Sequence, residues 1–138
     1  MTMGQPKLAY AKAGWNEYLS RLEKLHSIRV THLADKFAYD AKKIREVTSG
    51  TYTVALEITG KNLSSPELAQ FLKTRELEAR EVSFIIGGPK GLPQEIRDEA
   101  DFKWSFSSLT LPHDLAMVVL VESLYRASTI NASLPYHK

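Results

Sequence analysis

A glycine-rich break directly after an apolar strand constrains the fold of this sequence more than any other feature. Residues Val82 to Ile86 have the pattern of a buried strand, and Gly87, Gly88 and Gly91 fall within the next five residues. Glycine permits backbone conformations and close approaches that a Cβ atom blocks, so the main chain here is predicted to contact a ligand. Strand–glycine–helix turns also occur in many α/β domains that bind nothing, and the pattern alone leaves that alternative open.

A second loop, built of small polar residues, supports the prediction of a pocket. It covers residues 107–110 (SSLT) and leads into the longest predicted helix, residues 111–131, which Pro112 opens. Free backbone N–H groups in such a loop and at a helix start can bind a ligand. Two loops of this kind on one sheet predict a small-molecule pocket.

Neither loop matches a named nucleotide-binding motif. Gly91 is followed by Leu92 and Pro93, where a P-loop has Lys and then Ser or Thr, and no G-x-G-x-x-G occurs in the sequence. The residues alone therefore predict a pocket without naming its ligand.

Length and composition narrow the class of protein. A chain of 138 residues is expected to form one domain, spanning residues 1–138. It has no cysteine, which excludes a disulfide framework, a thiolate nucleophile and a cysteine-rich metal site, and no metal is expected. No apolar run approaches the roughly 20 residues of a membrane span, and the N-terminus lacks a signal pattern, so no membrane partner and a cytoplasmic location are expected.

The net charge of +2 hides an asymmetry along the chain. Residues 1–50 carry nine Lys and Arg against five Asp and Glu, whereas residues 51–138 carry nine against eleven. A modest basic bias suits contact with phosphate groups, although many solvated helices share it.

Strands and helices alternate along the chain, which predicts an α/β fold with a mostly parallel sheet flanked by helices. A turn is expected at Thr59-Gly60. At the N-terminus only Met-Thr-Met precedes Gly4, which is short for a first strand. This strand is either stunted or continued by residues upstream, and we favour the second alternative. The predicted strands are 27–33, 51–58, 82–86 and 103–107, and the predicted helices are 6–22, 35–49, 65–77, 93–100 and 111–131.

Several motifs occur in one order along the chain: LEITGKNLSS (56–65), IIGGPKGL (85–92), SLTLPH (108–113), ESLYRA (122–127) and PYH (135–137). Together with PKLAYAKAGWNEYLSRL (6–22), they resemble the ribosomal large-subunit pseudouridine N3-methyltransferases of the SPOUT class. The resemblance implies a C-terminal trefoil knot, S-adenosylmethionine as cofactor, a homodimer, and action on large-subunit ribosomal RNA within the assembled ribosome. Two alternatives remain: a SPOUT enzyme for another RNA position, or a non-catalytic cofactor-binding protein of ribosome assembly.

The resemblance also assigns cofactor-binding positions. Glycine permits close approach of the backbone, leucines can flank an adenine, and main-chain groups can recognise its edge. The implied residues are Leu56, Gly87, Phe106, Ser107, Ser108, Leu109, Thr110 and Leu111.

On the substrate side the resemblance points to His113, Arg126, Tyr136 and His137. Arg126 follows Glu122 by four residues, a spacing that allows an ion pair on one helix face. The spacing is equally compatible with a structural ion pair and with a catalytic role for Arg126. Tyr136 and His137 suit an aromatic–imidazole platform for an unstacked base. Methylation at a ring N–H requires a proton acceptor, and the sequence does not identify it.

Overall fold

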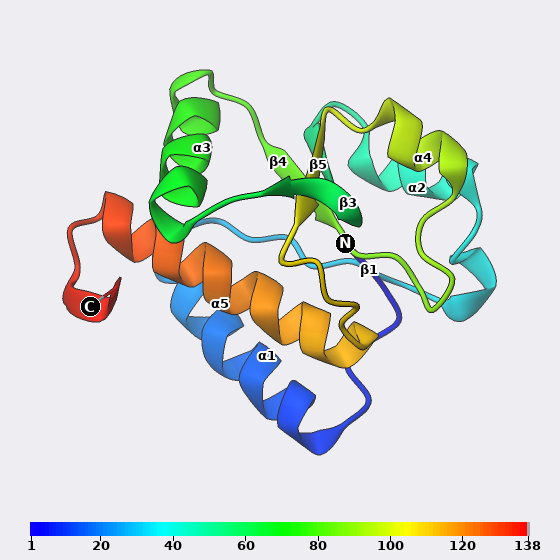
Figure 1. Cartoon of the computed structure of the whole chain (residues 1–138), viewed down its shortest axis with the longest axis horizontal. Coiled ribbons are helices and arrows are strands. Elements are labelled where there is room, and N and C mark those ends of the chain that lie inside the picture. Colours follow the sequence, from blue (N-terminus) through cyan, green and yellow to red (C-terminus); the bar gives the residue numbers. More distant parts are fainter. Residues whose placement is uncertain (138) are drawn as a thin grey trace.

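Short parallel strands form the centre of the molecule, whose computed structural model describes residues 1–137 (Figure 1). Their bounds are β1 Thr2–Met3, β2 His32–Leu33, β3 Tyr52–Asn62, β4 Val82–Ile85 and β5 Phe102–Ser105. β3 lies between β4 and β5, β1 pairs with β2, and a bridge from Thr2 to Ile86 joins β1 to the end of β4. The described strands therefore follow the order β2, β1, β4, β3, β5, and these pairings are all parallel, which confirms the predicted α/β class.

Helices cover the strands on both sides. In Figure 1, α1 and α5 run side by side below the strands, α3 packs near the C-terminal half of α5, and α2 and α4 form a pair at the opposite end. None of the described helices is long and apolar enough to cross a membrane. The bounds are α1 Ala9–Leu22, η1 Asp35–Phe37, α2 Ala41–Thr48, α3 Ser65–Leu77, α4 Gln94–Glu99, α5 His113–Asn131 and η2 Pro135–His137.

The start of α3 follows directly from its sequence. Ser64 accepts the backbone N–H of Glu67, whose side chain accepts the backbone N–H of Ser64 in return, and Pro66 lies in the first turn. This capping box satisfies two N–H groups that a helix start would otherwise leave unpaired. Leu68 is buried, whereas Leu77 is 78% exposed, because the helix ends there beyond the edge of the core.

The first helix is shorter than its sequence pattern predicts. It begins at Ala9, so Pro6 precedes it, and Leu8 is an exposed N-cap residue rather than part of the buried face. Trp15 and Leu22 are buried. The backbone N–H groups of Lys7 and Leu8, just before the helix, donate to the Asp114 side chain of α5.

Two strand predictions were wrong in their length. The predicted strand 27–33 is reduced to His32–Leu33, because its partner β1 has only two residues. The predicted turn at Thr59-Gly60 is absent, and β3 continues to Asn62 with a register shift between Leu56 and Lys61 opposite β5. Gly60 is needed within this strand, since a Cβ atom there would lie 2.7 Å from the Lys103 carbonyl carbon.

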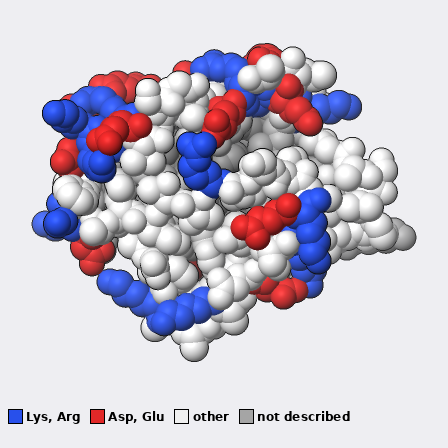
Figure 2. Space-filling model, turned by 180° about the vertical axis from the view of Figure 1, so that it is seen from behind, with Lys and Arg blue, Asp and Glu red and all other residues white. Residues whose placement is uncertain are grey.

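Charges of both signs lie close together on the surface between α2 and α4 and on one face of the molecule. Arg45 of α2 donates to Glu95 at 2.6 Å and to Glu99 at 2.7 Å on α4, so the acidic side chains of α4 that face α2 are paired at the surface. Figure 2 shows Lys and Arg beside Asp and Glu at several places on one face, with uncharged surface between these groups. On that face the modest basic excess of the sequence does not form a continuous positive band.

Candidate cofactor site

A cavity of about 580 Å³ opens where β4 and β5 end, between the glycine loop and the loop before α5. Its volume is in the range of small-molecule sites, and the carboxyl ends of parallel strands are where α/β proteins place their ligands. Most of the residues predicted to bind a cofactor line this cavity, namely Leu56, Gly87, Phe106, Ser107, Leu109, Thr110 and Leu111. Ser108 is exposed and is not among the lining residues.

The glycine loop forms one wall and closes on itself. A Cβ atom at Gly87 would lie 2.6 Å from the Gly91 carbonyl carbon, and the Gly91 N–H donates to the Gly88 carbonyl at 2.9 Å. The Tyr39 hydroxyl accepts the backbone N–H of Lys90 at 3.0 Å, which fastens the loop to the segment before α2. The close approach of the Gly91 backbone therefore requires glycine at position 87, whether or not a ligand is bound. The sequence did not reveal this reason.

The second loop is shaped by its serines. The Ser105 hydroxyl donates to the Ser107 carbonyl at 2.8 Å, and the Ser107 hydroxyl accepts the backbone N–H of Leu109 at 3.0 Å. These local bonds fold the loop back over the end of β5. Leu109, 70% exposed, is left at the rim of the cavity as an apolar side chain that a ligand could cover.

The sequence prediction did not single out Glu57, which also lines the cavity. Its side chain is 13% exposed, and its Oε2 atom lies 3.8 Å from Arg97 Nη1. Burial raises the pKa of the Glu57 carboxyl, while Arg97 and Lys103 act in the opposite direction. An acidic residue within a largely apolar strand, directly after Leu56, was the signal in the sequence that could have identified it.

His113, the first residue of α5, also lines the cavity. Its Nε2 atom is buried without a hydrogen-bond partner among the described residues, and its Nδ1 atom lies 3.6 Å from Asp114 Oδ1. The Asp114 Oδ2 atom accepts the backbone N–H groups of Lys7 at 2.8 Å and Leu8 at 2.6 Å. The bond from Leu8 is the main reason that the pKa of Asp114 is lowered. A carboxylate facing Nδ1 favours a proton on that nitrogen and leaves Nε2 as an acceptor.

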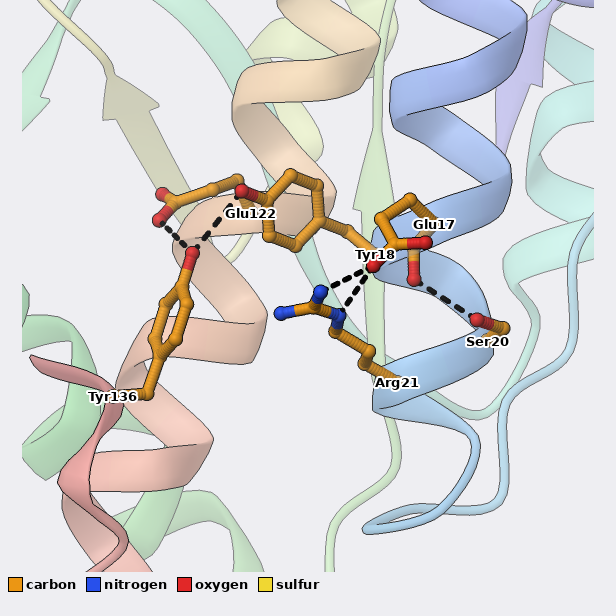
Figure 3. A network of polar contacts seen from close by, with 6 residues as sticks. All are labelled: Glu17, Tyr18, Ser20, Arg21, Glu122 and Tyr136. Atoms are coloured by element: carbon orange, nitrogen blue, oxygen red, sulfur yellow. Dashed lines mark hydrogen bonds and ion pairs between the residues drawn. The ribbon is translucent and has the colours of Figure 1, made fainter.

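Arg126 and Tyr136 belong to a different cluster, near the C-terminal end of α5. Figure 3 shows Tyr136 of this cluster together with Glu122 and Tyr18. Arg126 donates to Glu122 Oε1 through Nη2 at 2.6 Å and Nε at 3.0 Å, so the predicted ion pair is present. The Tyr136 hydroxyl donates to the same oxygen at 3.1 Å and also lies 3.1 Å from the Tyr18 hydroxyl of α1. Burial and these two hydrogen bonds raise the pKa of Tyr136. The Arg126 guanidinium lies 4.9 Å from the centre of the Tyr136 ring, a stabilising cation–π distance.

One chain does not bring the predicted cofactor and substrate residues together. His113 lies at the cavity, but Arg126 lies 13 residues further along the same helix. At a rise of 1.5 Å per residue this separation is about 20 Å. The side chain of His137 lies outside the described part of the chain.

Parallel strands with a backbone-lined cavity at their ends define an α/β protein with a small-molecule site. Residues 1–137 match the model of a family described as predicted SPOUT methyltransferases, and the chain belongs to this SPOUT methyltransferase family. The resemblance seen in the motifs is thereby confirmed. The trefoil knot that the family implies stays a prediction.

Full-length relatives extend this result. The chain is 44% identical over 140 residues to a protein of Deinococcus deserti, covering 100% of this chain and 97% of the relative. It is 36% identical over 154 residues to a protein of Carboxydothermus hydrogenoformans, with 100% and 97% covered. Both relatives bear the name ribosomal RNA large subunit methyltransferase H.

Proposed function

We propose that this chain is an S-adenosylmethionine-dependent methyltransferase that methylates N3 of a pseudouridine in large-subunit ribosomal RNA within the assembled ribosome. The names of its relatives support ribosomal RNA as the substrate. The observation that carries the proposal is the shared cavity, since seven residues assigned to the cofactor by resemblance line one space of about 580 Å³.

The residues present fit this cofactor. Leu56, Ile86 and Leu111 supply apolar walls for an adenine, and the two loops present main-chain groups beside them. S-adenosylmethionine supplies an activated methyl group on a sulfonium. The protein has to hold that group in line with the target nitrogen and exclude water, which needs neither a metal nor a covalent intermediate on the enzyme.

Removal of the proton from the target nitrogen falls to His113 in this proposal. Its Nε2 atom is buried at the cavity and has no hydrogen-bond partner among the described residues, so it is available to accept a hydrogen bond from a substrate N–H. Asp114 would stabilise the imidazolium that results, because its carboxylate oxygen faces Nδ1.

The distance of about 20 Å along α5 between His113 and Arg126 supports a homodimer with composite sites. A two-fold axis could bring Arg126 and Tyr136 of one subunit to the cavity of the other. The interspersed charges in Figure 2 are consistent with recognition of a folded ribosomal surface rather than of free RNA. Such a substrate would place the protein in the cytoplasm, with the ribosome.

The test uses purified protein, methyl-labelled S-adenosylmethionine, and ribosomes whose target pseudouridine is unmethylated. We expect 3-methylpseudouridine by mass spectrometry of nucleosides, with no product from free ribosomal RNA or from the Gly87→Arg variant. Equal methylation of ribosomes that carry uridine at the target would indicate another SPOUT substrate. Cofactor binding without any methyl transfer would indicate the non-catalytic assembly protein.

A further inference from the structure

We propose that Glu57 makes the cavity favour the positively charged methyl donor over its demethylated product. This inference rests on the proposed function of the cavity as a site for S-adenosylmethionine. It assigns a role in ligand discrimination to a residue that the sequence comparison did not single out.

The position of Glu57 in the cavity is the first argument. It follows Leu56 in β3, lines the cavity, and is 87% withdrawn from solvent, since its side chain is 13% exposed. Among the described lining residues, the other ionisable side chain is His113. Glu57 is therefore the source of negative side-chain charge in the cavity wall.

The second argument is that the charge of Glu57 is only partly balanced by the protein. Its partner Arg97 approaches to 3.8 Å, longer than a hydrogen bond, and also donates to Gln94. Lys103 lies 3.9 Å from Asp98, so its charge is shared with a second carboxylate. Burial is the main cause of the raised pKa of Glu57, and it outweighs the opposite effects of Arg97 and Lys103. The neighbouring cations therefore do not fully compensate the negative charge of the carboxylate. A cation in the cavity would complete the balance.

The chemistry of the two ligands supplies the third argument. S-adenosylmethionine and S-adenosylhomocysteine share the adenosine, the ammonium and the carboxylate, and differ by a methyl group and one positive charge on sulfur. In a partly desolvated site, one unit charge within about 8 Å of a carboxylate alters a binding constant by on the order of tenfold. The discrimination needs no direct contact, because the attraction between two charges still acts over several ångströms in a partly desolvated site. Once the methyl group is transferred, the product loses this attraction and is released more readily.

The experiment compares wild-type protein with Glu57→Gln, which preserves shape and removes the charge. Calorimetric titrations at neutral pH use S-adenosylmethionine, S-adenosylhomocysteine, and sinefungin, which carries a protonated amine in place of the sulfonium. We expect Glu57→Gln to weaken binding of the two cationic ligands by about tenfold and to change binding of S-adenosylhomocysteine by less than about twofold. Glu57→Asp should keep the wild-type preference, and thermal unfolding should show that each variant is folded.

Arg97→Gln is the matched control, because it removes the cation that opposes the effect. It should increase the preference for S-adenosylmethionine over S-adenosylhomocysteine. Equal losses of all three ligands in Glu57→Gln would reveal a purely structural role and overturn the inference while leaving the cofactor site intact. If the folded wild-type protein binds none of the three ligands, the proposed function fails, and the inference fails with it.

Discussion

The Asp114 carboxylate accepts the backbone N–H of Leu8 at 2.6 Å, across 106 residues of chain. The same oxygen accepts the N–H of Lys7, so the approach to α1 is fixed to the first turn of α5. That turn also places His113 at the cavity. A single carboxylate therefore couples the packing of two helices to the geometry of the candidate site.

We expect Asp114→Ala to destabilise the protein by about 2–3 kcal/mol, because it leaves two backbone N–H groups without their charged acceptor. Urea unfolding followed by circular dichroism measures this change. Asp35→Asn is the control: its side chain is 78% exposed and 3.8 Å from Lys7, and its loss should change stability by less than about 0.5 kcal/mol. Equal stability of Asp114→Ala and wild type would show that water replaces the carboxylate at no cost.

The contribution of Asp114 should also depend on pH. Its pKa in the folded protein is lowered from the usual 3.8, chiefly by the Leu8 N–H. The stabilisation is complete at pH values above 3.8. It declines as the pH falls below that value towards the folded-state pKa, because the unfolded chain binds the proton first. Comparing urea unfolding of wild type and Asp114→Asn over an acid pH series should show the stability difference shrinking as pH falls, whereas a constant difference would assign it to other causes.

Most helices and strands and the parallel character of the sheet were accessible from the sequence, because local patterns and their alternation define them. Ser64 and Glu67 form a capping box at the start of the helix predicted for residues 65–77, and the apolar run of β4 ends at the glycine break. The wrong predictions concern segments whose structure depends on residues far away in the sequence. The sequence around Leu8 continues a helical apolar pattern, but its backbone is held by Asp114, and the β-branched segment 27–33 lacks a partner long enough to pair with it.

Most of the residues that line the cavity were predicted, because they belong to local sequence motifs. Gly87 and residues 106–111 are contiguous motifs, and the resemblance could transfer them position by position. Glu57 was missed because its significance depends on burial and on its 3.8 Å distance from Arg97, neither of which spacing reveals. The separation of His113 from Arg126 was already implied by the single helix predicted for residues 111–131, and α5 confirms that this helix is unbroken.

Gly87→Ala should abolish cofactor binding. The added Cβ atom would lie 2.6 Å from the Gly91 carbonyl carbon, a backbone atom that cannot move without opening the glycine loop. Gly50→Ala is the control, because its Cβ atom meets nothing within 4 Å, although its φ of +78° adds strain of about 1 kcal/mol. Calorimetric titration with S-adenosylmethionine should show binding to Gly50→Ala and none to Gly87→Ala. Wild-type affinity in Gly87→Ala would mean that the loop is not part of the site.

Composite sites in a homodimer predict complementation between two inactive variants. Gly87→Arg destroys the cavity and Arg126→Ala removes the substrate-side cation, so each variant alone should be inactive. In a mixed dimer, one site combines both defects and the other has neither. After mixing by unfolding and refolding at equal concentration, about one quarter of the wild-type methylation activity should return. If both parts of the site come from one chain, mixing restores nothing.

The bridge between Thr2 and Ile86 has a consequence for biosynthesis. β1 lies inside the sheet, between β2 and β4, and its residue Thr2 is translated 84 positions before its bridge partner Ile86. At about 5–20 residues per second, the strand that completes its pairing is translated several seconds later. A nascent chain that stops short of Ile86 cannot close its central sheet, so the N-terminal half is exposed to chaperones and proteases until most of the chain has been made.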